Sequence, residues 1–165
     1  VRALLEEHDF TGLAFADPIR AMIRELLTSN GIDDRFMDDR DFKETVIHEL
    51  GVSYRHMAQS LGTEWGRNLQ PDFWLRIAGA FMDDRIDDGD THFVISDVRF
   101  ENEAEWVRER GGVIWRVKRE AAAPVRTHQS EAEIEHIEHD WTIHNDGSLE
   151  DLREAVGTSL QVALP

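Results

Sequence analysis

Apolar residues recur along the chain in two patterns, as short unbroken runs and as runs with helical spacing. The short runs, rich in β-branched and aromatic residues, predict strands at 10–15, 93–95, 113–117 and 141–143. Apolar residues three and four positions apart predict helices at 19–27, 53–61, 71–81, 102–110 and 148–162. Strands that alternate with helices favour a parallel sheet with right-handed crossovers, so the pattern predicts an α/β fold.

The stretch from His92 to Glu103 joins a predicted buried strand to a predicted helix. Its apolar run, 93–95, is followed by Asp97 and Arg99 before the helical pattern begins. In an open α/β sheet, ligands bind where strands end and helices begin. An acid and a base two residues apart at this edge could hold a metal ion and a phosphate. A surface salt bridge with a helix cap is the alternative interpretation.

The helix predicted from residue 19 has a clear start signal. Asp17 can cap it, and Pro18 suits its first position. Arg20 lies in the first turn, where a cation opposes the helix dipole. This placement suggests that Arg20 has a role with an anion, and a solvated arginine is the alternative.

Two acidic stretches lie between the predicted helices. Residues 30–51 lack the spaced carboxylates, the central glycine and the terminal glutamate of an EF-hand. We therefore expect a solvated, mobile segment there rather than a calcium loop. Residues 82–90 are expected to form an acidic turn after the helix at 71–81.

Leu61 to Asn68 has the sequence L-G-T-E-W-G-R-N, an unusual mixture for a plain connector. Glycines let the backbone approach a ligand closely, a tryptophan offers a stacking plane, and an arginine offers a fork for phosphate. The alternative is a helix–helix turn around a buried tryptophan.

Composition narrows the class of protein. The 165 residues suffice for one domain, and they include no cysteine, which excludes disulfides and thiolate metal sites. The net charge of −16 argues against a nucleic-acid polymer as partner, although local arginines can still hold a nucleotide phosphate. No run is long and apolar enough to cross a membrane, and no secretory signal is visible. A cytoplasmic enzyme or binding domain without a membrane partner is expected.

The sequence lacks the motifs of a zinc site and of an α/β-hydrolase. The histidines have no H-x-x-x-H or H-E-x-x-H spacing, which argues against zinc, and no G-x-S-x-G elbow is present. Residues 118–130 instead form a basic stretch with one proline and three alanines, typical of a flexible, lid-like segment.

Five motifs together resemble the deoxynucleoside monophosphate kinases found mainly in bacteriophages and prophages. The resemblance extends over residues 10–156, and the blocks L-G-T-E-W-G-R and S-D-V-R-F-x-N-E are specific in combination. The motifs are F-A-D-P-I-R at 15–20, Y-R-H-M-A-Q-S-L-G-T-E-W-G-R at 54–67, P-D-F-W at 71–74, V-I-S-D-V-R-F-E-N-E at 94–103 and I-H-N-D-G-S-L-E-D-L at 143–152.

The resemblance implies a P-loop nucleoside monophosphate kinase-like, three-layer fold with a central parallel sheet. Residues 1–165 would form a single kinase-like domain, with a helical acceptor-binding insertion at 29–90 and a lid region at 118–139. The implied enzyme is an ATP:dNMP phosphotransferase, which transfers the γ-phosphoryl group of ATP to a deoxynucleoside monophosphate with Mg²⁺ and yields a dNDP and ADP.

One departure from the family concerns the phosphate loop. No G-x-x-x-x-G-K-[ST] occurs in the chain, and Val1 lies inside a predicted helix end. The resemblance therefore implies a first strand and phosphate loop before Val1. A truncated or inactive protein is the alternative.

The resemblance also implies roles at the acceptor. Phosphoryl transfer asks the protein mainly for positioning and charge neutralisation. Asp97 would organise magnesium or the acceptor phosphate. Bidentate guanidinium forks would converge on that phosphate, from Arg20, Arg55 and Arg99.

Further implied roles concern the acceptor's sugar and base. Glu103, one turn beyond Arg99, would receive the sugar hydroxyl or the base. Trp74, and less certainly Trp65, would stack on the base, and Gly62 would permit close approach.

The implied ATP-binding residues are Arg119 and Asn145. Arg119, in the lid, would reach the ATP phosphates at closure and so join Asp97 and Arg99 as a catalytic residue. Asn145 resembles a position near the adenine. Asp17 would be either a cap alone or a second acidic group at the acceptor.

Two alternatives to this function remain open. One is a kinase of the same fold that acts on another small phosphate ester, such as phosphomevalonate or dephospho-coenzyme A. The other is a non-catalytic nucleotide-binding domain, if the phosphate loop is truly absent. The stacking tryptophans favour a base-bearing acceptor. The accepted bases, the choice between deoxyribose and ribose, and a homodimer are left open.

Overall fold

The structure, a computed structural model, describes residues 4–5, 8–39, 42–119 and 134–163. The chain divides into two compact units. The first consists of Val1–Gly12 with Asp90–Pro165, and the second of Leu13–Gly89. Within the described ranges, no helix has both the length and the apolar character needed to cross a membrane.

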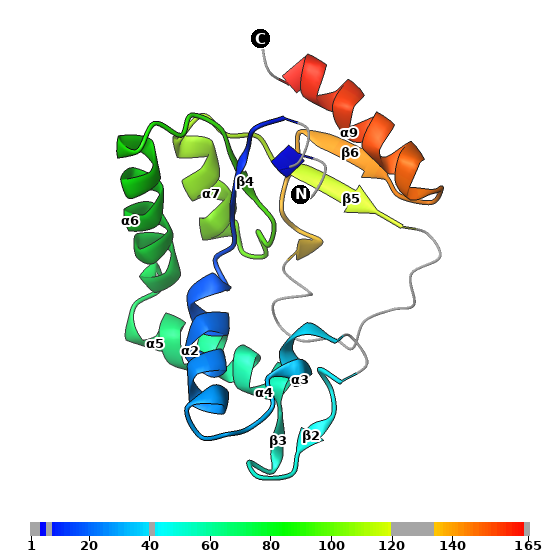
Figure 1. The fold of residues 1–165 in the computed structure, drawn as a ribbon. Helices are drawn as coiled ribbons and strands as arrows, with labels where there is room; N and C mark the ends of the chain where they lie inside the picture. The colour runs from blue at the N-terminus through cyan, green and yellow to red at the C-terminus, as the bar shows by residue number, and fades with distance from the viewer. Residues whose placement is uncertain (1–3, 6–7, 40–41, 120–133, 164–165) are drawn as a thin grey trace. The chain divides into compact units, whose positions relative to one another are not determined.

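The first unit is an α/β arrangement whose elements are shown in Figure 1. Strands β5 (Trp115–Lys118) and β6 (Trp141–His144) pair in parallel, with Trp115 opposite Trp141 and Lys118 opposite His144. Helix α9 (Leu149–Ala163) packs against β6. This pair confirms the prediction of parallel strands.

A second strand pair of this unit leads to the predicted ligand edge. Strand β4 (Phe93–Ile95) forms where the apolar run predicts it and pairs with β1 (Thr11–Leu13). The Thr11 N–H donates to the His92 carbonyl at 2.8 Å. Helix α7 (Glu101–Glu109) follows β4 and ends at Gly111, whose φ of +74° favours glycine.

Two apolar clusters form the core of the first unit. One contains Leu4, Ile143 and Val156, with Val94 of β4 packed against it. The other contains Ala104, Ile114 and Ile137, with Val98 and Val107 packed against it. Apolar packing of Val94 and Val98 therefore fixes both β4 and the loop that follows it.

The second unit begins with helix α2 (Asp17–Thr28), which buries Ile19, Ile23 and Leu27. Met22 and Leu26, which the apolar spacing also predicts to be buried, are exposed. Helix α4 (Tyr54–Gln59) starts at Ser53, whose hydroxyl accepts the His56 N–H at 3.3 Å. The sequence predicts this cap correctly.

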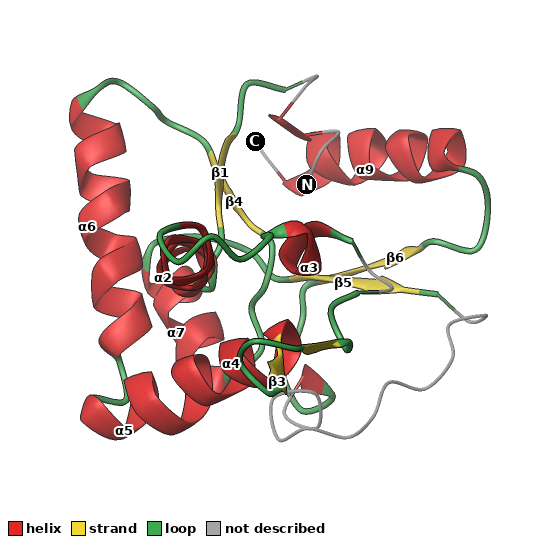
Figure 2. Cartoon of the chain, turned by 60° about the horizontal axis from the view of Figure 1, so that its bottom comes forward, coloured by secondary structure: helices red, strands yellow, loops and turns green. Residues whose placement is uncertain are grey.

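The structure corrects the expectation for residues 30–51, which contain regular elements. They include the short helix α3 (Arg35–Asp38) and the first strand of an antiparallel hairpin formed by β2 (Val46–Ile47) and β3 (Val52–Ser53). Figure 2 shows β3 beside α4, with which it is in contact. Ile47 is fully buried. The sequence does not predict the hairpin, because a two-residue strand held by one buried side chain is too short to show an alternating apolar pattern.

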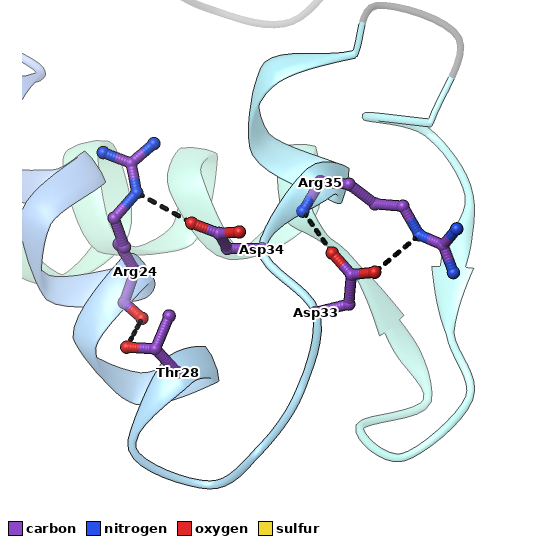
Figure 3. Close-up of polar contacts among 5 residues, drawn as sticks. All are labelled: Arg24, Thr28, Asp33, Asp34 and Arg35. Atoms are coloured by element: carbon purple, nitrogen blue, oxygen red, sulfur yellow. Dashed lines mark hydrogen bonds and ion pairs between the residues drawn. The ribbon is translucent and has the colours of Figure 1, made fainter.

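Aspartates in this segment serve local contacts. Asp34 accepts from Arg24 Nε of α2 at 3.1 Å. Asp33 accepts the Arg35 N–H at 2.9 Å and pairs with the Arg35 side chain at 3.1 Å (Figure 3). These contacts connect the end of α2 to the start of α3.

The structure also corrects the helix boundaries after residue 59. The π-helix η1 (Ser60–Gly66) and the short α5 (Arg67–Leu69) continue directly from α4. Helix α6 (Phe73–Asp87) is longer than predicted and includes most of the expected acidic turn. It ends at Gly89, whose φ is +104°. The predicted helix ended where the apolar spacing stopped. The helix itself continues, because acidic residues can lie on a helix surface.

Helix α9 begins with a reciprocal cap. The Ser148 hydroxyl accepts the Asp151 N–H at 3.2 Å, and Asp151 Oδ2 accepts the Ser148 N–H and O–H, each at 2.7 Å. These hydrogen bonds from Ser148 lower the pKa of Asp151 below its ordinary value. A Cβ at Gly147 would lie 2.5 Å from the Asp151 carboxylate, so glycine makes room for the cap.

This cap predicts a pH-dependent contribution to stability. Because the folded-state pKa of Asp151 is lowered, its contribution should be complete above the ordinary aspartate pKa and should disappear as the pH falls through the folded value. Asp151→Asn should therefore lower the Tm at neutral pH, and the difference from wild type should shrink in acid. Glu150→Gln, in the same turn, controls for charge at the helix start. Parallel Tm curves for wild type and Asp151→Asn between pH 2 and 7 would contradict the assignment.

Candidate functional site

The loop between β4 and α7 carries the acid and the base predicted at this edge. Asp97 is half-buried and Arg99 is exposed. Val98, between them, packs against the cluster of Ala104 and its neighbours. The loop is thus anchored in the core by its middle residue, and the two charged residues flank that anchor.

Glu103, predicted to receive the sugar or the base, is only 4% exposed. Its Oε2 atom accepts the backbone N–H groups of Arg99 at 2.7 Å and Phe100 at 3.2 Å. Phe100 is the N-cap residue of α7 and has no side-chain oxygen, so Glu103 caps the helix from its third position. This carboxylate oxygen faces the backbone of the site loop, and that is where the structure differs from the predicted role.

The residues predicted for ATP lie at neighbouring strand ends. Arg119 follows Lys118 of β5, and Asn145 follows His144 of β6, its partner across the parallel pair. The Asn145 N–H donates to the Lys118 carbonyl at 2.7 Å. The register therefore brings Arg119 and Asn145 to the same carboxyl-terminal edge of the pair.

The predicted lid region, 118–139, is described only at its two ends. Residues 120–133, including Arg126 and His128, lie outside the described residues. The end after residue 133 is attached to the first unit. Arg116 donates to the Ile134 carbonyl at 2.7 Å, and Ile137 is 7% exposed in the core. Residues 134 and 137, inside the predicted lid region, are therefore held in the first unit.

In the second unit, the two arginines predicted for the acceptor phosphate each lie beside one carboxylate. Arg20 Nη1 contacts Asp17 Oδ1 at 2.9 Å, and Asp17 Oδ2 accepts the Ala14 N–H at 2.9 Å. Asp17 thus stabilises the turn before α2 and orients Arg20. Arg55 of α4 pairs with Glu44. Both arginine side chains keep more than a third of their surface exposed, and Arg55 Nε is itself buried.

The glycines of η1 make room for side chains of the unit itself. A Cβ at Gly62 would lie 3.0 Å from Ile19, and one at Gly66 would lie 2.5 Å from the Trp74 ring. Trp74 Nε1 donates to the Gly62 carbonyl at 2.7 Å, and its side chain is 4% exposed. Trp74 therefore packs in the core, and in this structure it offers no open face for a base. The alternative for residues 61–68, a helix–helix turn around a buried tryptophan, is wrong, because residues 60–66 are helical and their own tryptophan, Trp65, is exposed.

Trp65 is the exposed tryptophan of η1, with 43% of its surface accessible. Its ring meets Phe73 edge-on, with centroids 5.6 Å apart, and lies 6.4 Å from Trp74. This aromatic support fixes the ring while leaving part of it open. The sequence favoured Trp74 over Trp65 as the residue that stacks on the base, because spacing alone does not reveal which indole is buried.

The donor set at Asp97 is suited to magnesium. Among the described residues, no three acidic or histidine side chains gather into a metal-binding group. Magnesium in nucleotide enzymes is held by one or two carboxylates together with substrate phosphates. One carboxylate after a strand, with an exposed arginine two residues on, fits that donor set.

Comparison with known proteins identifies the family. The family model described as deoxynucleotide monophosphate kinase matches residues 20–156. The chain belongs to this family. A protein of Acanthamoeba polyphaga mimivirus named for the same activity is 30% identical over 159 residues, which cover 90% of the chain and 81% of that protein.

Two phage members of the deoxynucleotide monophosphate kinase family also match. The enzyme of Enterobacteria phage T4 is 29% identical over 111 residues, covering 67% of the chain and 46% of that protein. That of Escherichia phage RB69 is 33% identical over 101 residues, covering 61% and 41%. The chain thus spans less than half the length of these phage kinases. The family range, 20–156, includes all the residues predicted for the site except Asp17, and membership makes the chain a nucleotide kinase.

Whether Gly66 makes the room that the Trp74 ring needs can be tested. Gly66→Ala places a methyl group against the indole ring and should destabilise the protein by about 1–3 kcal/mol. Gly157→Ala, in α9 with nothing within 4 Å of the new Cβ, is the matched control and should be neutral or stabilising by about 1 kcal/mol. Denaturant unfolding measures both. Equal effects of the two substitutions would show that Trp74 does not need this room.

Proposed function

We propose that the chain catalyses transfer of the γ-phosphoryl group of ATP to a deoxynucleoside monophosphate, giving a dNDP and ADP. The observation that carries the proposal is the pair Asp97 and Arg99, held after β4 in a chain of this kinase family. We further propose the P-loop nucleoside monophosphate kinase-like fold for the full-length protein. Parallel β5 and β6 with α9 against β6 support it.

At the β4 edge, Asp97 holds Mg²⁺ or orients the acceptor phosphate, and Arg99 binds that phosphate. Bound magnesium would neutralise charge on the transferred phosphoryl group. The Arg99 guanidinium adds a bidentate donor for the phosphate oxygens. Because phosphoryl transfer depends mainly on position and charge, these two groups supply what the reaction asks of this loop.

At the β5–β6 edge, Arg119 binds ATP phosphate and Asn145 lies at the adenine. Their neighbouring backbone positions support a common ligand. An exposed arginine retains a long reach, whereas Asn145 is half-buried and its backbone is bonded to β5. Arg119 therefore supplies a mobile charge for the phosphates, and Asn145 supplies a fixed amide for the base.

In the second unit, Arg20 and Arg55 bind acceptor phosphate by exchanging a carboxylate for a phosphate oxygen. Exposed ion pairs contribute at most about 1 kcal/mol, so the exchange costs little. Asp17 and Glu44 keep the guanidinium groups oriented until the anion arrives. The exposed ring of Trp65 is the surface on which the base stacks.

A coupled assay that follows ADP formation tests the reaction in the full-length protein. The four dNMPs, phosphomevalonate and dephospho-coenzyme A serve as acceptors, and removal of Mg²⁺ with EDTA should abolish transfer. Trp65→Ala should raise the KM for the dNMP on the order of 5- to 100-fold, and Trp65→Phe should restore it. Transfer to the other esters alone, or to none of the acceptors, would contradict the proposal.

The role of Arg99 gives a quantitative expectation. Arg99→Ala should cost about 2–4 kcal/mol of transition-state stabilisation, on the order of 30- to 1000-fold in kcat/KM for the dNMP. Arg76→Ala is the control, because Arg76 forms an exposed ion pair with Asp72 on α6 and has no predicted contact with substrate. Its kcat/KM should stay within about twofold of wild type. Unchanged turnover in Arg99→Ala would remove Arg99 from the acceptor site.

A further inference from the structure

Glu103 is the charged side chain that stands out in the described residues, because it is buried. Its exposed fraction is 4%, and no other polar or charged residue of the described ranges falls in the buried class. A buried carboxylate is costly unless hydrogen bonds or charges compensate it. Its position therefore calls for an explanation in terms of its partners.

Two hydrogen-bond partners of this carboxylate are backbone groups of the site loop. Oε2 accepts N–H groups from two consecutive residues, Arg99 and Phe100. Hydrogen bonds to an ionised acceptor are about twice as strong as neutral ones. Two such bonds to adjacent amides restrict the peptide between them, and this peptide determines the direction in which the Arg99 side chain leaves the backbone.

The loop has a second anchor two residues before Phe100. Val98 packs against the core cluster that contains Ala104, the residue next to Glu103 on α7. The loop is thus held to α7 by apolar contact at Val98 and by hydrogen bonds at Arg99 and Phe100. Arg99 itself remains exposed. A rigid backbone with an exposed guanidinium is the arrangement expected where a charged group must be placed accurately.

We propose that Glu103 is a positioning residue, which acts on the substrate through Arg99 and does not contact the nucleotide. Its carboxylate accepts the Arg99 and Phe100 amides and so fixes the point from which the guanidinium reaches the acceptor phosphate. This inference rests on the proposed function of the loop. It replaces the sequence-based expectation that Glu103 receives the sugar hydroxyl or the base.

The proposal predicts different outcomes for an isosteric substitution and for a truncation of Glu103. Glu103→Gln removes the charge but keeps an amide oxygen that can accept both N–H groups, so kcat/KM should stay within about threefold of wild type. Glu103→Ala removes the acceptor, and the loop loses its position. Misplacement on the order of 1 Å can cost about 100-fold, so kcat/KM for the dNMP should fall by about 10- to 100-fold. Glu101→Gln, an exposed carboxylate in the same helical turn, is the control and should have no effect.

A double-mutant cycle shows whether Glu103 acts through Arg99. If it does, Glu103→Ala should reduce kcat/KM in the wild-type background and have little further effect in Arg99→Ala. Effects that multiply in the double variant would overturn the proposal, as would a loss in Glu103→Gln as large as that in Glu103→Ala. If Glu103→Ala fails to fold, Glu103→Gln alone decides: near-normal kinetics support positioning, and a large loss indicates direct contact through the charge.

A readout independent of catalysis distinguishes failure of this inference from failure of the proposed function. Hydrogen exchange followed by NMR should show protection of the Arg99 and Phe100 amides in wild type and in Glu103→Gln, and loss of protection in Glu103→Ala. Unprotected amides in wild type would overturn the positioning role whatever the activity. Protected amides in a protein that transfers no phosphoryl group would overturn the proposed function and leave the hydrogen bonds of Glu103 established.

Discussion

The hydrogen bonds of the Glu103 carboxylate couple the site loop to the helix that follows it. Helix starts leave backbone N–H groups without partners, and the N-cap residue here, Phe100, has no side-chain acceptor. Glu103 supplies the missing acceptor from inside the helix. The desolvation cost of its burial is offset by two amide donors. The start of α7 and the course of the Asp97–Arg99 loop are therefore one structural feature.

In the second unit, two glycines leave room for larger side chains to pack. Gly62 and Gly66, four residues apart in η1, leave space for Ile19 and for the Trp74 ring. The Gly62 carbonyl satisfies the indole N–H, which would otherwise be buried without a partner. A π-helix is rare and is often found near functional sites. Here it presents Trp65 outward while its glycines hold the neighbouring aromatic residue in the core.

Several arginines in the described part of this acidic protein form ion pairs at the surface. Arg24 with Asp34, Arg76 with Asp72 and Arg108 with Glu101 join neighbouring elements or helical turns. Each such pair contributes little to stability. The same property makes arginine–carboxylate pairs readily exchangeable with phosphate, so a net charge of −16 is compatible with binding a nucleotide.

The sequence by itself determined the features that depend on short-range patterns. The apolar run of β4, the cap at Ser53 and the glycine end of α7 follow from local residue preferences. Placement of Asp97 and Arg99 at a strand end follows from the same pattern. The family motifs identified the kinase before any geometry was considered.

Only the tertiary structure decided which side chains face the interior. Glu103 and Trp74 both look like ligand-binding residues in the sequence, and both are buried. The Trp74 indole bonds the Gly62 carbonyl of a different helix, whereas Glu103 turns back to amides within its own motif. The two-residue strands of the hairpin and the acidic last turns of α6 have too little apolar periodicity to be recognised. The partner of a carboxylate or an indole N–H is set by which group the fold brings within about 3 Å, and no local spacing encodes that distance.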